Sequence, residues 1–219
     1  MFREIFPNVF LFQSNFSGSN VFLLTGKRIA LIDSGSSDYA VELKNSLEKA
    51  GIDCNKVELV LHTHGHADHF GCDFLFKNAK IIMHKFDAKF VNEKDFDFTA
   101  AGIIETKHFP KINSFFREKE IIDLKNFKLK VIFTPGHTAG SVCFFDSKKG
   151  FLFSGDTLFE GSFGRFDLPS GNRKELFNSI KKISGLKFNF LLPGHGGILN
   201  GSQKENIQSA LESLNQEFL

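Results

Sequence analysis

Apolar residues fall into short runs along the chain, and polar or glycine-containing turns separate these runs. Runs of this length between turn signals are typical of β-strands. In the first part of the chain the pattern predicts strands at residues 9–12, 20–24, 29–32, 57–61 and 80–84. Apolar positions three and four residues apart instead predict helices at 38–50 and 69–77, the first capped by Asp38 and ended by Gly51.

The β pattern returns after residue 121. The strands predicted there are residues 127–133, 141–145, 150–153 and 188–192. A helix is predicted at 172–184, because Asn172 and Glu175 form a capping-box-like start and Gly185 stops the apolar periodicity. A final amphipathic helix is predicted at 203–217.

Residues 85–120 are the least regular part of the chain. Phenylalanines alternate there with charged residues, and one proline interrupts the segment. We expect short helices and loops that lie over the functional site, as a lid or as a wall against the substrate. The alternative is a peripheral helical insertion with its own phenylalanine core.

No linker, low-complexity run or fixed-period repeat divides the 219 residues. Strands followed by a helix occur in each half of the chain. We therefore expect a single domain over residues 1–219, of the α/β class, in which helices cover two sheets.

The composition excludes several classes of protein. A net charge of +2 does not indicate binding of nucleic acid, and no apolar run is long enough to span a membrane. The three cysteines form no CxxC pair and no secretion signal begins the chain, so we expect a cytoplasmic protein without disulfides. The 29 phenylalanines are interpreted as core-filling residues without a chemical role.

Potential metal ligands follow four of the predicted strands. The densest group is the stretch 62–69, which holds four of the eight histidines and Asp68 directly after the strand at 57–61. Later strand ends carry His137, Asp156 and His195. Imidazole and carboxylate are ligands that divalent metal ions prefer, and strand ends on one edge of a sheet converge in space. The sequence therefore predicts a metal site assembled from several strand ends.

These residues carry a resemblance to a known family. The motif His64-x-His66-x-Asp68-His69, followed by His137, Asp156 and His195, resembles that of the metallo-β-lactamase superfamily, and Ile32-Asp33-Ser34-Gly35 also matches. The resemblance covers nearly the whole chain. It implies a four-layer αβ/βα sandwich with a pair of metal ions between the loops of the two sheets.

The resemblance also implies individual roles. His64, His66 and His137 would hold the first ion. Asp68, His69 and His195 would hold the second, and Asp156 would bridge the two. The implied cofactors are two divalent metal ions, with zinc expected and iron or manganese as alternatives. Asp33 would orient a ligand from behind, and an aspartate that only forms the turn is the alternative.

The remaining histidines and the cysteines lie outside this motif. His62 lies two residues before His64, the first residue of the motif. It is expected to be a core or surface histidine with satisfied hydrogen bonds, and a supporting role beside the ligands is the alternative. His84 and His108 are expected to be structural. Cys54, Cys72 and Cys143 match no ligand position and are expected to serve packing.

The segment 155–169 is similar to the glyoxalase II branch of the superfamily. The implied function is hydrolysis of a thioester such as a 2-hydroxyacyl-glutathione, with a metal-bridging hydroxide as nucleophile. Asp68 can also take up a proton during turnover, although in a two-metal site we expect it to be a ligand. Arg165 is a candidate for binding a substrate carboxylate, and a loop-fixing pair with Asp167 is the alternative.

Two further functions remain open. The element Gly164-Arg165-x-Asp167 is also similar to persulfide dioxygenases, which would use one iron held by His64, His137 and Asp156. A non-catalytic metal-binding or nucleic-acid-processing member of the superfamily is the second alternative. The leading interpretation expects a small-molecule thioester as the partner.

Overall fold

The computed structural model describes residues 1–14, 18–104 and 106–216, and two six-stranded sheets form its centre. The first sheet has its strands in chain order: β1 (Arg3–Phe6), β2 (Val9–Phe12), β3 (Val21–Leu24), β4 (Ala30–Ile32), β5 (Leu59–Leu61) and β6 (Lys80–Ile82). The second sheet contains β7 (Ile121–Asp123), β8 (Lys128–Phe133), β9 (Val142–Asp146), β10 (Phe151–Gly155), β11 (Phe190–Pro193) and β12 (Leu199–Asn200).

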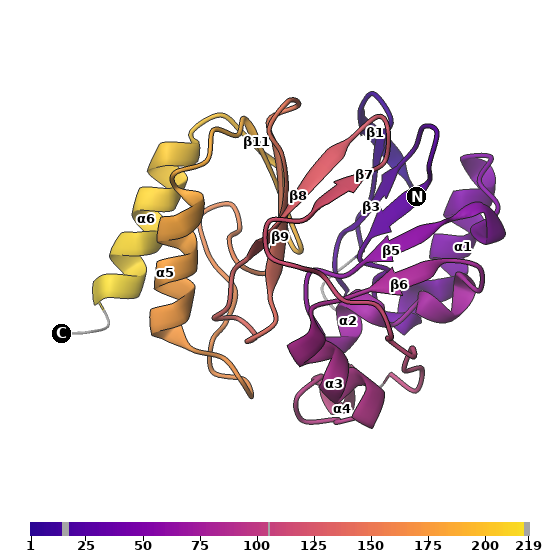
Figure 1. Cartoon of the computed structure of the whole chain (residues 1–219), viewed down its shortest axis with the longest axis horizontal. Coiled ribbons are helices and arrows are strands. Elements are labelled where there is room, and N and C mark those ends of the chain that lie inside the picture. Colours follow the sequence, from indigo (N-terminus) through magenta and orange to yellow (C-terminus); the bar gives the residue numbers. More distant parts are fainter. Residues whose placement is uncertain (15–17, 105, 217–219) are drawn as a thin grey trace.

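Helices cover the outer faces of the two sheets (Figure 1). Helix α1 (Ala40–Lys49) packs on the first sheet, and its buried Leu43 and Leu47 share a core with β3, β4 and β5. Helices α5 (Arg173–Ile183) and α6 (Gln203–Gln216) pack together on the second sheet. The architecture is the four-layer αβ/βα sandwich that the family resemblance implied.

Phenylalanines fill much of the core between the two sheets. Phe22 of β3 meets Phe153 of β10 edge to face, with their ring centroids 5.2 Å apart. Phe116 meets Phe144 in the same way at 5.3 Å. Edge-to-face pairs bury large apolar surfaces in a favourable geometry. The phenylalanine bias of the sequence therefore serves the core, as we expected.

The direction of the strands explains why one end of the molecule carries the chemistry. In the first sheet β4 and β5 are parallel. In the second sheet β10 and β11 are parallel, and β8 runs the same way because β9 is antiparallel to both β8 and β10. The carboxyl ends of these five strands, and the loops that follow them, meet at one edge, where Val142 N donates to Thr63 O across the two sheets at 2.8 Å.

All nine predicted strands are present, with ends shifted by no more than two residues. Strands β1, β7 and β12 were not predicted. Each of the three lies at the edge of a sheet, has only two to four residues and is largely exposed. Such a strand forms because a neighbouring strand offers hydrogen bonds, and its own residue pattern carries little signal.

The prediction of a helix over 69–77 was wrong. The structure has one turn of helix, α2 (Ala67–Phe70), and a separate 3-10 turn at Asp73–Leu75. The helix ends at Gly71, where a Cβ atom would lie 2.4 Å from the backbone nitrogen of Ser37. This close approach of two backbones accepts only glycine.

The other predicted helices are present. Ser36 rather than Asp38 caps the turn that leads into α1, and Asn172 caps α5 by accepting a hydrogen bond from Glu175 N at 3.0 Å. Helix α6 matches the predicted final helix up to residue 216, and residue 217 lies outside the described residues.

The segment 85–120 contains helices α3 (Lys85–Glu93) and α4 (Ala101–Ile104) and loops, as predicted. They pack with α2 around a small apolar core that includes Met83, Val91 and Ile112. Within the described part of the chain, no helix is long and apolar enough to cross a membrane.

Candidate metal centre

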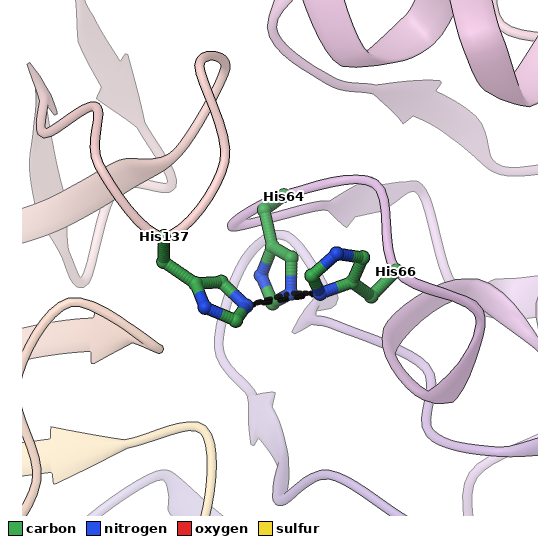
Figure 2. A group of neighbouring side chains, drawn as sticks. All are labelled: His64, His66 and His137. Atoms are coloured by element: carbon green, nitrogen blue, oxygen red, sulfur yellow. Dashed lines mark hydrogen bonds between the residues drawn. The ribbon is translucent and has the colours of Figure 1, made fainter. Parts of the chain in front are cut away.

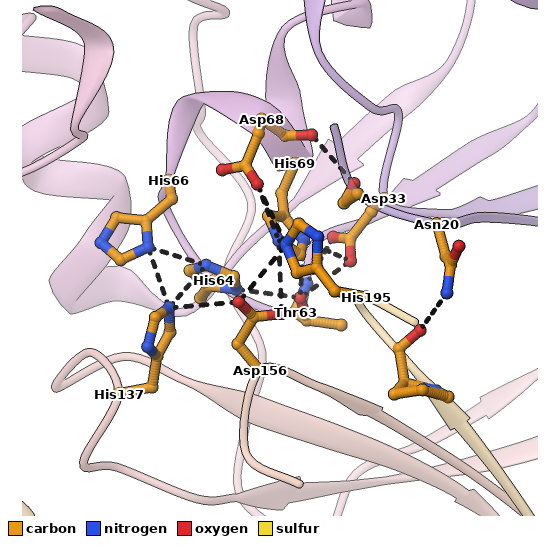
Figure 3. Close-up of polar contacts among 12 residues, drawn as sticks. Asn20, Asp33, Thr63, His64, His66, Asp68, His69, His137, Asp156 and His195 are labelled. Atoms are coloured by element: carbon orange, nitrogen blue, oxygen red, sulfur yellow. Dashed lines mark hydrogen bonds and ion pairs between the residues drawn. The ribbon is translucent and has the colours of Figure 1, made fainter. Parts of the chain in front are cut away.

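Side chains from four strand ends converge at the edge between the two sheets (Figure 3). The loop after β5 supplies His64 and His66, and α2 directly after it supplies Asp68 and His69. The turns that follow β8, β10 and β11 supply the remaining candidates, His137, Asp156 and His195. The structure thus brings all seven predicted ligands together, and they form three groups within which the possible ligand atoms lie no more than 4.8 Å apart.

His64, His66 and His137 form what we call the first half-site (Figure 2). The Nδ1 atom of His66 lies 3.0 Å from Nε2 of His64 and 2.9 Å from Nε2 of His137, and the two Nε2 atoms lie 3.2 Å apart. All three rings are buried. Burial, together with the neighbouring histidines, lowers the pKa of His64 and His66 well below the ordinary value, and burial lowers that of His137.

Asp68, His69 and His195 form the second half-site. The Nε2 atom of His195 lies 3.1 Å from Asp68 Oδ2 and 3.3 Å from His69 Nε2. Burial opposes the charged form of His195, but the Asp156 and Asp68 carboxylates outweigh it and raise the pKa of His195 to about 9. Burial likewise opposes ionisation of Asp68, yet His69 and His195 hold the pKa of this carboxyl well below its usual range.

Asp156 lies between the two half-sites. Its Oδ1 atom is 3.4 Å from His69 Nε2, and its Oδ2 atom is 3.6 Å from His137 Nε2 and 3.5 Å from His195 Nε2. The carboxylate therefore faces donors of both groups, which is the position that a bridging ligand requires.

These residues fit a pair of divalent ions. In the first half-site three nitrogens point at one another, and neutral imidazoles cannot satisfy three such contacts with hydrogen bonds alone. Asp156 Oδ1 is buried and forms no hydrogen bond within the described chain. Lone pairs that converge without protons between them are the arrangement that metal coordination requires, and imidazole with carboxylate suits zinc or iron.

Asp33 supports the centre from behind, where we expected a residue that orients a ligand. Its Oδ2 atom accepts hydrogen bonds from His69 Nδ1 at 2.9 Å and from Thr63 Oγ1 at 2.8 Å. Burial opposes its ionisation, but His69 and His62 lower the pKa of Asp33 to about 2. A carboxylate on the far nitrogen of a ligand histidine fixes which nitrogen faces the ion.

His62 is a buried core histidine, but the expectation of satisfied hydrogen bonds was wrong, because its Nδ1 atom has no hydrogen-bond partner among the described residues. Its surroundings are charged. Its Nε2 atom lies 2.8 Å from Asp73 Oδ2, and its Nδ1 atom lies 3.4 Å from Asp33 Oδ1. Burial opposes its charge, yet the two carboxylates raise the pKa of His62 to about 9. Through Asp33 this buried ion pair also contacts His69. Asp73 was not predicted as part of this network, because it was assigned to the helix expected over 69–77.

Arg165 contacts the centre through its backbone. Its guanidinium forms an exposed two-bond pair with Asp167, at 2.8 and 2.7 Å, which is the alternative considered for this residue. Its carbonyl oxygen accepts a hydrogen bond from His137 Nδ1 at 2.6 Å. The loop therefore orients a predicted ligand with a main-chain atom, for which a side-chain motif offers no signal.

Ser19 and Asn20 hold the loops of the second half-site. Asn20 Nδ2 donates to the carbonyl of Pro193 at 3.0 Å and to that of Gly196 at 3.1 Å, on both sides of His195. Ser19 Oγ donates to the carbonyl of Asp68 at 2.9 Å. Both residues are buried directly before β3, and neither was predicted to belong to the site.

The remaining candidates lie outside the centre, as predicted. His84 caps α3 and stacks edge to face on Phe133, and His108 packs on the ring of Phe74. The three cysteines are free thiols, none of which belongs to a group of metal ligands in the described chain.

Comparison with known proteins agrees with this geometry. Residues 14–195 match the model of the metallo-beta-lactamase superfamily. A probable metallo-hydrolase of Methanocaldococcus jannaschii is 34% identical over 194 residues, which cover 82% of this chain and 88% of the relative. The hydroxyacylglutathione hydrolase GloC of Haemophilus influenzae is 32% identical over 199 residues, which cover 85% of this chain and 89% of the relative.

A solved structure is similar in both fold and sequence. The crystal structure of TTHA1623 in a di-iron-bound form superposes with a TM-score of 0.73 and is 29% identical. The match covers 96% of this chain and 100% of that protein.

Proposed function

This chain belongs to the metallo-beta-lactamase superfamily, and from that premise we propose that it is a metal-dependent hydrolase of thioesters. The proposed substrates are 2-hydroxyacyl thioesters of glutathione or of a similar small thiol. The observation that carries this proposal is the complete set of ligand atoms in both half-sites, with the Asp156 carboxylate between them. The similarity to GloC over most of both chains supports the thioester class.

The proposed cofactors are two divalent ions, zinc or iron, one in each half-site. The di-iron form of TTHA1623 supports the number of ions and makes iron a candidate. When bound, such ions polarise a carbonyl oxygen and lower the pKa of a water molecule to about 7, so that hydrolysis needs no protein nucleophile.

The residues of the chain divide the remaining work. The first half-site offers three neutral imidazoles, because burial suppresses their charged forms. Asp68 stays ionised next to His69 and His195, and a carboxylate of such low pKa is a poor store for a proton. We therefore assign Asp68 the role of a ligand.

The substrate is proposed to approach over His195, whose side chain is 31% exposed while the first half-site is buried. The ring of Phe159 lies edge to face against His195 at 6.0 Å and offers an apolar wall there. A substrate carboxylate that bound Arg165 would have to displace Asp167 from the guanidinium. Substitution of Arg165 by alanine should then raise KM and leave kcat unchanged.

Metal analysis and a thioester assay on the purified protein test the proposal together. We expect two ions per chain and saturable release of free thiol from S-lactoylglutathione, with loss of activity after chelation and recovery after metal is returned. The variant His108→Ala is a matched control, because it removes a histidine outside the centre. It should retain both ions and the activity.

The same preparation tests the dioxygenase alternative. Uptake of oxygen on glutathione persulfide with a single bound iron, and no release of thiol from any thioester, would overturn the hydrolase proposal. A fully metallated protein that turns over neither substrate would favour a binding role.

A further inference from the structure

Asp87 is a buried carboxylate that lies beside the metal centre and belongs to none of the three ligand groups. It sits in the first turn of α3, on the face that also buries Ala88 and Val91. The proposed reaction assigns it no role.

The carboxylate joins the two loops that supply the first half-site. Its Oδ2 atom accepts a hydrogen bond from Gly65 N at 2.8 Å and another from Thr138 Oγ1 at 2.7 Å. Gly65 stands between His64 and His66, and Thr138 follows His137 directly. A single oxygen atom therefore connects segments 73 residues apart, each within one residue of the predicted ligands.

The two loops are shaped around this side chain. A Cβ atom at Gly65 would lie 2.9 Å from Asp87 Cβ, and one at Gly140 would lie 2.3 Å from Asp87 Oδ1. Both distances are too short for any residue larger than glycine. The glycines allow the two loops to close on the carboxylate from opposite sides.

The surroundings of Asp87 are neutral. Its partners are a hydroxyl group and backbone N–H groups, and burial raises the pKa of Asp87 to about 6. A buried carboxylate without a counter-ion costs folding free energy. An apolar residue would pack on Val91 at lower cost, so the polar contacts to the loops are the reason we see for an aspartate here.

We propose that Asp87 is a positioning residue that sets the distance between the 64–66 loop and the 137–138 loop, and so preforms the first half-site. The inference rests on the proposed metal function but not on the substrate. The second half-site is held by Ser19, Asn20 and Asp33, and Asp87 forms no hydrogen bond with its residues in the described chain.

The test is a zinc titration of chelator-treated full-length protein in competition with a coloured chelator, which yields two binding constants without any substrate. The variants His137→Ala and His195→Ala, each lacking one donor, assign the constants to the half-sites. In Asp87→Ala the affinity of the first half-site should fall about 10- to 100-fold, as for other residues that support a ligand, and that of the second should change less than about 3-fold.

Two further variants separate positioning from simple destabilisation. Asp87→Asn keeps an oxygen at the Oδ2 position and should restore the first affinity to within about 3-fold of the natural protein. Asn92→Ala removes two hydrogen bonds of 2.8 Å between the same helix and Ile112, away from the metal loops. It should lower the unfolding midpoint and leave both zinc constants unchanged.

Unchanged zinc binding in Asp87→Ala would overturn the inference, and so would equal losses in both half-sites or an equal loss in Asn92→Ala. If Asp87→Ala does not fold, Thr138→Val removes the hydroxyl partner with little change of shape, and it must weaken the first half-site alone. A protein that binds two zinc ions normally but hydrolyses no thioester would remove the proposed function and leave the role of Asp87 intact.

Discussion

The first half-site consists of three buried histidines, whereas the second combines one buried histidine with an aspartate and with His195, which is 31% exposed. Burial and like neighbours lower the pKa of His64 and His66, while carboxylates raise the pKa of His69 and His195. The same side chain is thus favoured as neutral in one group and as a cation in the other, although the ring centroids of His64 and His69 lie only 4.0 Å apart.

The supports of the two half-sites also differ. A buried carboxylate, Asp87, and the carbonyl of Arg165 hold the first. The Asp33 carboxylate orients His69 in the second, and neutral donors of Ser19 and Asn20 hold its loops. The comparison suggests a division of labour, in which a closed group retains an ion and a more open group meets the substrate.

Asp156 is the residue that the two half-sites share, so its removal should weaken metal binding in both of them. In Asp156→Ala we expect loss of about 1,000-fold or more in kcat/KM, because both ions lose a ligand at once. Elemental analysis should show fewer than two ions per chain. A variant that keeps two ions and full activity would exclude a bridging role.

Removal of one histidine from the first or the second half-site should affect different metal ions. His137→Ala takes a donor from the closed group and should leave the purified protein with one ion or none. His195→Ala should keep the first ion and lose the second, with affinity for the lost ion reduced about 100-fold or more. Zinc titration with elemental analysis distinguishes the two variants. Loss of the same zinc-binding constant in both variants would show that the half-sites are not independent.

Asp87 supports the first half-site with a titratable group, whereas Asn20 supports the second with a neutral amide. The free energy of unfolding of the metal-free protein should therefore depend on pH through Asp87. Its pKa is raised from 3.8 to about 6 in the folded protein, so its contribution to stability is fully present below pH 3.8 and is lost as the pH rises through 6. Between pH 8 and pH 4 the natural protein should gain roughly 2–3 kcal/mol relative to Asp87→Asn, since one pKa unit corresponds to about 1.4 kcal/mol. Urea unfolding of both proteins at several pH values measures this difference, and a constant difference would contradict the assignment.

Asn20 supports the second half-site in the way that Asp87 supports the first. Asn20→Ala removes two hydrogen bonds to the carbonyls of Pro193 and Gly196 and should weaken the second zinc constant about 10-fold. The first constant should not change. Asn55→Ala, which alters an exposed asparagine in a 3-10 turn outside the three ligand groups, serves as the control. A loss in the first constant would mean that the supports are shared.

Much of the centre could be predicted from local signals. His137, Asp156 and His195 each combine a residue type that binds metals with a position directly after an apolar strand. Asp33 matched a motif of four consecutive residues at the end of β4. The elements themselves follow from alternation, helical spacing and caps, which act within a few residues.

Asp87 and Asp73 are two residues near the centre whose roles local signals do not predict. Asp87 lies on an otherwise apolar helix face, and this polar residue in a buried stripe is the one mark that sequence alone offers. Asp73 was missed because it was assigned to a helix over 69–77. In the structure this helix ends at Gly71, where the backbone of Ser37 approaches closely. Nothing local to residue 71 reveals a neighbour that is 34 positions earlier in the chain.

The potential ligands, the strands that carry them and the presence of two sheets could be predicted from the sequence, because periodicity and residue chemistry are local properties. Which side chains support which half-site could not be predicted, because it depends on contacts between distant segments. The contacts of Asp87 with Gly65 and Thr138 span 22 and 51 residues, and that of Asn20 with Pro193 spans 173. Such contacts arise when loops from different strands close on one another, and the charge state of each histidine then follows from the burial and the neighbours that this closure creates.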